Sequence, residues 1–207
     1  MITPKHLTLE EIRSSADEFR RKYIHPVELV PAPIEEIIEF DLGMDIVPIH
    51  NLTSKTDIES FISNDLKTIS IDSKLYNHHS YENRLRYTYA HEMGHYVLHN
   101  QDIQDNNFGS VEEWIKCREE IGENDLIWYE QQAYEFAGRL LVPKNILIQK
   151  VKELNQKIVE FRKVYDKSFD EKLIIVLSRI INNHFGVSNQ VIEKRIKKEK
   201  IFEELGF

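Results

Sequence analysis

Apolar residues recur at every third or fourth position near the start of the chain, which is the spacing of an amphipathic helix over residues 8–23. Thr8 stands where this helix would begin, and Glu11 follows three positions later, as in a capping box. The proline-rich residues 26–33 cannot continue the helix and are expected to be extended. A shorter helix is predicted over residues 33–42, before a glycine that would end it.

The pattern becomes β-like in the next part of the chain. Strands are predicted over residues 45–50, 59–63 and 67–72. In the last of them Ile69 and Ile71 alternate with polar neighbours, as in a half-buried strand. We therefore expect one small three-stranded sheet.

Helical periodicity returns after the sheet and continues almost to the end of the chain. Helices are predicted over residues 81–99, 112–121 and 126–141, from Pro143 onward, and over the final pair 170–185 and 188–202. Gly186 and Ser188 would end and begin the two helices of that pair. The polar residues 102–110 are expected to form a loop. The predicted fold class is α+β, mostly helical, with a small three-stranded sheet and a C-terminal helical hairpin.

Composition narrows the class of protein. A chain of 207 residues fits one domain, or one domain with a small appendage. Its one cysteine, Cys117, excludes a disulfide framework and a thiolate zinc cluster. There is no apolar run of the about 18 residues that span a membrane, and no secretory signal at the start. These features favour a cytoplasmic protein with no membrane segment.

Two of the nine histidines carry the strongest chemical signal. His91-Glu92-Met93-Gly94-His95 is an HExxH motif inside a predicted helix. Residues four apart lie about 40° apart around a helix, so both imidazoles can face one metal ion. Glu92 is rotated by about 100° from His91 and stands beside the metal, where a general base for an attacking water is needed. The motif indicates a hydrolytic metal site.

The third ligand of such a site is left open by the spacing. A catalytic zinc usually has three protein ligands, and the candidates are His99, Glu130 and Glu135. His99 is rotated by about 80° from His91 and could instead support the ligands from behind. Glu130 shares its helix face with small residues that would let two helices approach closely, although it could be an ordinary surface carboxylate. Glu135 lies about 140° further round and is expected to face solvent.

Two longer segments resemble a known family. Residues 86–99 are similar to the active-site helix of the ImmA/IrrE family of metallopeptidases. Residues 130–143, with their E-x-x-A-x-x-F-A core and closing Leu-Leu-Val-Pro, resemble the second signature of that family. Residues 34–47 and 67–72 resemble its opening helix and strand and the strand before the active-site helix. The likeness covers roughly residues 30–145.

The resemblance implies a zincin-like fold with a small sheet over two active-site helices. It also implies Zn²⁺, or alternatively Mn²⁺, bound by His91, His95 and Glu130, with Glu92 catalytic. Members of the family act as regulatory proteases in bacteria and their mobile elements, and they cleave or otherwise inactivate helix–turn–helix repressors. The expected function is therefore a metal-dependent endopeptidase whose protein substrate is such a repressor. The alternative is a non-proteolytic metal-binding regulator that acts by binding a repressor or DNA.

Two boundaries follow from this interpretation. The metallopeptidase domain is expected over residues 1–145, with residues 1–28 as a helix that precedes the core. Residues 146–207 would form a C-terminal helical region packed on the same domain. The stretch between the two motifs is long, and residues 102–124 are interpreted as an insertion that shapes the cleft.

The C-terminal hairpin raises the question of nucleic-acid binding. Its last part carries a basic face made of Lys194, Arg195, Lys197, Lys198 and Lys200. A DNA-reading helix is one hypothesis. The net charge of −8 and the interspersed glutamates favour a packed hairpin with a solvated face. Docking of a repressor substrate onto these helices is a third possibility.

Aromatic side chains near the motifs have several possible roles. The family often carries Asn or Asp where this chain has Tyr134, which leaves the support of His91 through its second ring nitrogen in doubt. Tyr96, Tyr129 and Tyr134 are candidates for stabilising an oxyanion, although packing explains each one as well. The pair His78-His79 is interpreted as part of a polar loop.

Overall fold

A computed structural model describes residues 5–106, 108 and 110–207. Its first helix, α1 (Leu9–Tyr23), begins at Thr8 with the predicted capping box. The Thr8 hydroxyl accepts a hydrogen bond from the backbone N–H of Glu11, and the Glu11 carboxylate accepts one from the backbone N–H of Thr8 at 2.8 Å. The apolar stripe of α1 packs on α8 (Glu123–Leu141), so this helix covers the core from one side.

The three predicted strands form one sheet in the order β1-β3-β2. β1 (Asp45–Ile49) runs parallel to the central strand β3 (Thr68–Asp72), and β2 (Ser60–Ile62) runs antiparallel to it. The half-buried alternation predicted for β3 is wrong, because Ser70 and Asp72 are buried as well as the isoleucines. A central strand is covered on both faces, and the Asp72 carboxylate accepts hydrogen bonds from the backbone N–H groups of Thr53 and Lys74.

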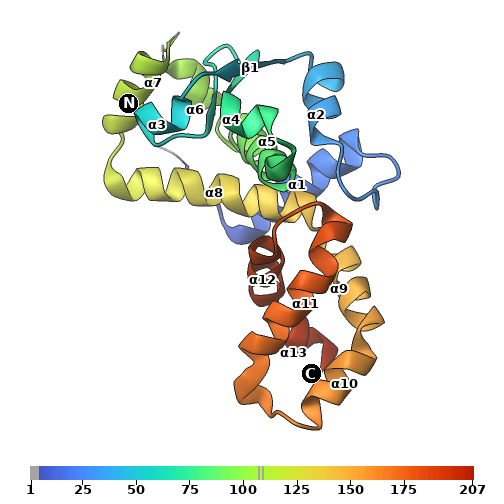
Figure 1. The fold of residues 1–207 in the computed structure, drawn as a ribbon. Helices are drawn as coiled ribbons and strands as arrows, with labels where there is room; N and C mark the ends of the chain where they lie inside the picture. Colours follow the sequence, from blue (N-terminus) through green and yellow to red (C-terminus); the bar gives the residue numbers. More distant parts are fainter. Residues whose placement is uncertain (1–4, 107, 109) are drawn as a thin grey trace.

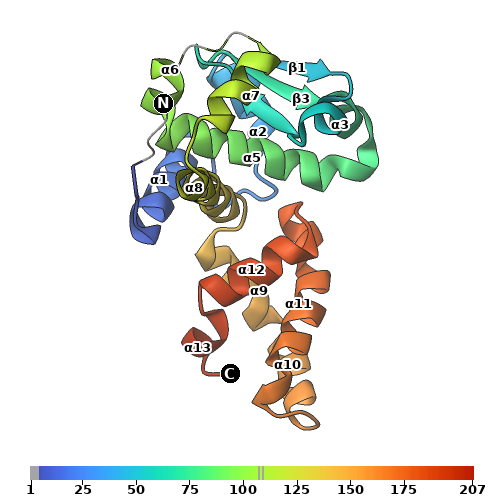
Figure 2. The ribbon, with the colours of Figure 1, turned by 90° about the vertical axis from the view of Figure 1, so that its left-hand side faces the viewer.

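Beneath the sheet lie the two longest helices, α5 (Glu82–Leu98) and α8, which are the most closely packed pair in the molecule (Figure 2). The small residues that the sequence places on both helices allow this approach. A Cβ atom at Gly94 would lie only 2.9 Å from the Cα atom of Ala133. Between α1 and β1 the predicted helix is present as α2 (Ile34–Glu36) followed by a π-helical turn, η1 (Ile37–Asp41).

Short helices surround this central part. α3 (Leu52–Thr56), α4 (Ser73–Asn77) and the 3-10 turn η2 (His79–Tyr81) connect the strands to α5. The loop predicted over residues 102–110 is wrong in its first half, where α6 (Asn100–Asp105) is anchored by the buried Ile103. Residues 107 and 109 lie outside the described residues. α7 (Val111–Glu119) then leads to α8.

The remaining helices form the lower part of the molecule, below α8 (Figure 1). They are α9 (Lys144–Glu153), α10 (Asn155–Arg162), the 3-10 turn η3 (Lys167–Phe169), α11 (Asp170–Phe185), α12 (Asn189–Lys198) and α13 (Ile201–Leu205). Gly186 at φ 61° and the capping side chain of Ser188 separate α11 from α12 as predicted. The single helix predicted over residues 188–202 is wrong, because Lys200 adopts a left-handed conformation and turns Ile201 and Phe202 into the core.

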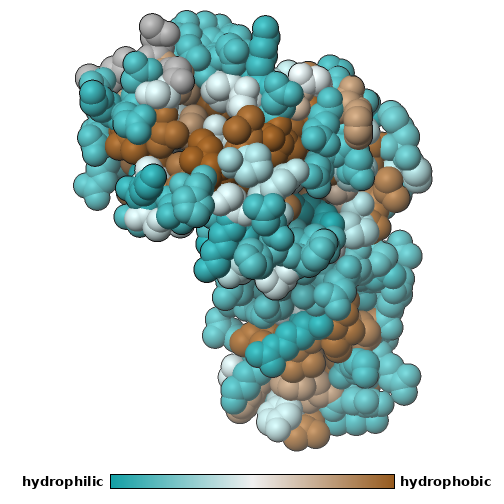
Figure 3. All heavy atoms as spheres, turned by 45° about the horizontal axis from the view of Figure 1, so that its top comes forward, coloured by the Kyte–Doolittle hydropathy of each residue, from teal (hydrophilic) through white to brown (hydrophobic). Residues whose placement is uncertain are grey.

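One continuous hydrophobic cluster joins the upper and lower parts, from Ile12 to Phe202. Hydrophilic side chains cover much of the face in Figure 3, and a band of hydrophobic residues crosses its upper part. Within the described residues, none of the helices combines the length and the apolar character needed to cross a bilayer. The observed class is therefore α+β and mostly helical, as predicted.

Candidate metal centre

The HExxH motif lies on the buried face of α5, below the sheet. About one turn of helix separates His91 from His95, so their rings lie on the same side, edge to face, with centroids 4.7 Å apart. The two Nε2 atoms face each other at 3.1 Å. Two imidazole nitrogens this close in a buried site are well placed to share one cation.

Glu130 completes a triangle of donor atoms from the facing helix α8. Its Oε2 atom lies 3.2 Å from Nε2 of His91 and 3.9 Å from Nε2 of His95. Zinc–ligand bonds of about 2.0–2.1 Å in a tetrahedron place donor atoms about 3.3 Å apart. The three side chains therefore fit a single zinc-sized ion in both chemistry and spacing.

The carboxylate of Glu130 is ionised in this environment. Burial raises its pKa, but the hydrogen bond and the electrostatic interaction with His91 outweigh burial and hold the pKa below its usual value. An ionised carboxylate beside two imidazoles is the donor set of a hydrolytic metal site.

Glu92 is 3% exposed and points toward the sheet side of the cleft. Its Oε1 atom accepts a hydrogen bond of 2.5 Å from the hydroxyl of Ser60 on β2. Burial raises the pKa of Glu92 to about 7, against the opposing effects of His91 and Ser60. A carboxyl group with a pKa near neutrality can both take up and release a proton, as a general base must.

His99 lies behind the triangle and takes no part in it. Its Nδ1 atom is 3.0 Å from Nδ1 of His95, and its ring stacks on Tyr129 at a centroid distance of 4.1 Å. Burial lowers the pKa of His99 to about 4, so the ring is neutral near pH 7. The side chain therefore holds the ring of His95, which is the supporting role that the sequence left open for it.

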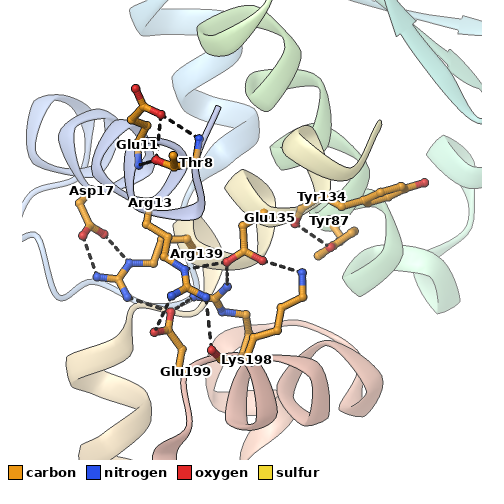
Figure 4. A network of polar contacts seen from close by, with 11 residues as sticks. Thr8, Glu11, Arg13, Asp17, Tyr87, Tyr134, Glu135, Arg139, Lys198 and Glu199 are labelled. Carbon is orange, nitrogen blue, oxygen red and sulfur yellow. Dashed lines mark hydrogen bonds and ion pairs between the residues drawn. The ribbon is translucent and has the colours of Figure 1, made fainter. Parts of the chain in front are cut away.

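The predicted exposure of Glu135 is the clearest error of the sequence-based interpretation. Expected to face solvent, Glu135 is 3% exposed and turns toward the lower helices (Figure 4). Its carboxylate contacts Arg13 at 2.9 Å, Arg195 at 2.7 Å and Lys198 at 2.7 Å. A periodicity argument places a residue on a helix face, but it cannot show that basic residues 60 or more positions away cover that face.

Tyr134 lies beside the centre but does not support His91 in the usual way. Its ring centroid is 4.3 Å from that of His91, and half of the tyrosine is exposed. Nδ1 of His91 is buried, and no hydrogen-bond partner for it is present in the described part of the chain. Tyr129 packs on His95 and His99, whereas Tyr96 lines a different hollow near Ser15.

The three donors open into a cleft of about 390 Å³ between β2, α5, α7 and α8. α7 contributes Trp114 and Arg118 to its lining, so the segment over residues 102–124 helps to shape the cleft, and its interpretation as an insertion stays a prediction. The Nε atom of Arg118 is buried, and within the described residues it has no hydrogen-bond partner. The sequence did not single out Arg118 or Ser60, since no motif marks them. His78 packs on Tyr81 and does not line the cleft. Burial raises the pKa of the Cys117 thiol, which therefore stays protonated near neutral pH.

Comparison with known proteins gives one match. A family model described as IrrE N-terminal-like domain, of the peptidase family M78, matches residues 75–197. The matched range contains the whole donor triangle and runs across the boundary predicted at residue 145. No curated protein and no solved structure matches the chain.

Proposed function

Because the chain belongs to the IrrE N-terminal-like family of metallopeptidases, we propose that it is a metal-dependent endopeptidase that cleaves a helix–turn–helix repressor. One observation carries this proposal: three ligand atoms of His91, His95 and Glu130 converge beside a buried carboxyl group, Glu92. The domain boundary at residue 145 remains a prediction.

Zn²⁺, or alternatively Mn²⁺, is the proposed ion, held by His91, His95 and Glu130. When bound, such an ion polarises a substrate carbonyl and lowers the pKa of water toward about 7. Three protein ligands leave a tetrahedral site with one open position, which is the arrangement of a catalytic rather than a structural zinc.

Glu92 moves the proton in the proposed reaction. Its carboxylate takes a proton from the water that attacks the carbonyl carbon of the scissile bond, and it then donates this proton to the leaving amine. The peptide C–N bond breaks, and a carboxylate and an amine are released. Ser60 donates a hydrogen bond to one Glu92 oxygen, and the other oxygen is then available to accept the proton of the attacking water.

The cleft offers binding elements on both sides of the donors. β2 pairs with β3 through one edge only, and residues 57–62 line the cleft, so an extended peptide can pair with this strand. Arg118 supplies a positive charge on the α7 side, where it can stabilise the negative charge that develops on the carbonyl oxygen.

A repressor substrate is proposed from the family-like motifs at residues 86–99 and 130–143 rather than from the geometry. The lone thiol of Cys117 suits a reducing compartment, and we place the reaction in the cytoplasm on that ground. The competing function is a regulator that binds a repressor or DNA without cleavage. The position of Glu92, buried beside the three donors and facing the cleft, favours the peptidase, since a purely binding protein has no need of a base there.

Replacing Glu92 by Gln tests the mechanism. The E92Q variant keeps the metal ligands, and we expect unchanged metal content by elemental analysis and no cleavage of a helix–turn–helix repressor that the wild type cleaves. E130A is the paired variant, in which we expect loss of metal as well as of cleavage. Cleavage by E92Q at the wild-type rate would refute the mechanism, and repressor inactivation without cleavage would favour the competing function.

A further inference from the structure

A second groove begins where the metal cleft ends. It has a volume of about 750 Å³ and lies between α5, α8 and α12. Three residues line both hollows, Arg84, Tyr87 and Tyr134, so the two are neighbours along one surface. Figure 4 shows Tyr87 and Tyr134 beside Glu135 on α8, with Lys198 reaching Glu135 from the helix below. A substrate segment that extends from the metal centre past Tyr134 would therefore enter this groove.

The far wall of the groove is basic. Lys194, Arg195 and Lys198 of α12 line it, and Glu135 is the one carboxylate among the described lining residues. Glu135 is buried and already holds three cations. Lys194 is exposed, and within the described residues it has no hydrogen bond or ion pair.

The ion-pair cluster below the groove also carries more positive than negative charges. Its cations are Arg13, Arg139, Arg195 and Lys198, and its carboxylates are Asp17, Glu135 and Glu199. Four positive and three negative charges leave an excess of +1, to which Lys194 adds another. This happens in a chain with a net charge of −8, so the positive groove is a local exception.

We propose that this groove is a docking site for an acidic segment of the protein substrate, next to the scissile bond. The proposal rests on the peptidase function above and names the chemistry of its substrate. Lys194 would face a substrate carboxylate, and the rings of Tyr87 and Tyr134 would contact the chain between the groove and the metal centre. Gln131 and Gln190 can bond to its backbone.

A peptide fits this site better than a nucleic acid. The groove continues into the cleft that contains the metal donors, where a peptide substrate would be cleaved. The basic face for which the sequence raised the hypothesis of a DNA-reading helix is also largely engaged in ion pairs. Arg195 is buried in ion pairs, Lys197 pairs with Glu171 and Lys198 pairs with Glu135.

Fluorescence anisotropy with the full chain carrying E92Q tests the proposal without any cleavage step. The probes are a labelled ten-residue peptide rich in Asp and Glu, the same peptide with Asn and Gln instead, and a labelled short DNA duplex. Each is titrated with the parent protein, with K194E, with K194R and with K157E. Lys157 is exposed on α10 and does not line the groove, so K157E changes the net charge of the protein equally.

We expect the acidic peptide to bind more tightly than its amide counterpart and the duplex. K194E should weaken its binding by about tenfold, while K194R and K157E change it by less than about twofold. Equal losses in K194E and K157E, or equal binding of the two peptides, would overturn the proposal. Tighter binding of the duplex would assign the groove to nucleic acid and overturn it as well. Melting curves verify that each variant is folded.

The peptidase function and the docking site can be refuted independently of each other. Binding of the acidic peptide requires neither a metal nor a working Glu92, so it can be found even if the chain cleaves nothing. If the wild type cleaves a repressor but the anisotropy assay shows no preference for the acidic peptide, the peptidase function is supported and the docking site is refuted.

Discussion

Replacing Glu135 by Gln removes the charge at the centre of the buried cluster that joins α8 to α1 and α12. The side chain is 2% exposed and faces Arg13, Arg195 and Lys198. Although burial alone would raise its pKa, the positive charge of Arg195 and the hydrogen bonds from Lys198 and Arg13 lower the pKa to about 2. The variant would leave these cations without their shared counter-charge.

The magnitude follows from the pKa. A shift from 4.5 to about 2 corresponds to about 3 kcal/mol of folding free energy at neutral pH, at 1.36 kcal/mol for each pKa unit. Because the folded state has the lower pKa, this contribution is fully present above pH 4.5. It is lost as the pH falls toward 2, where the wild-type carboxylate also becomes protonated.

Urea unfolding of wild type and E135Q at pH 7 and pH 3 measures this effect. We expect a difference in unfolding free energy of about 3 kcal/mol at pH 7 and a clearly smaller one at pH 3. E171Q is the matched control, since Glu171 of α11 also pairs with a lysine of α12, Lys197, but is 80% exposed. It should cost less than about 0.5 kcal/mol. A difference for E135Q that stays the same at both pH values would refute the reasoning.

Three further variants probe the centre and its cleft. G94A adds a Cβ atom 2.9 Å from Ala133, so it should separate the two helices, destabilise the protein by about 1–3 kcal/mol and lower the metal content found by elemental analysis. Y134N offers an amide oxygen near Nδ1 of His91, so chelator competition should show about tenfold tighter metal binding, and unchanged affinity would mean that the amide does not reach the ring. R118A should leave the metal content unchanged and lower kcat/KM for the repressor by about a hundredfold, and an unaltered kcat/KM would exclude an electrostatic role for this side chain.

Local patterns were enough to predict much of the fold. The capping box at Thr8, the strands around Ile69 and the stop at Gly186 depend on neighbours in the sequence, and each is present. The two helices of the centre were predicted for the same reason. The spacing of His91 and His95 is a property of any helix, so the face they share could be derived before the structure was known.

The errors come from interactions between distant segments. Glu135 is buried because Arg13 and Arg195 reach it from the two ends of the chain. α6 forms because Ile103 is buried in the core, although the residues next to it in the sequence are polar. Arg118 enters the cleft only through the path of α7, and no spacing rule links it to the HExxH motif.

The position of Glu135 on α8 has a consequence for dissecting the molecule. Glu130 and Glu135 lie five residues apart on one rigid helix, and they serve the metal centre and the junction with α12 respectively. A fragment that stops near residue 145 would keep every metal donor, yet it would leave the carboxylate of Glu135 without Arg195 and Lys198 and would cut through the hydrophobic cluster that continues from α8 into α9, α11 and α12. Such a fragment is expected to aggregate, so peptidase units transplanted between relatives should be cut after α13 and not after α8.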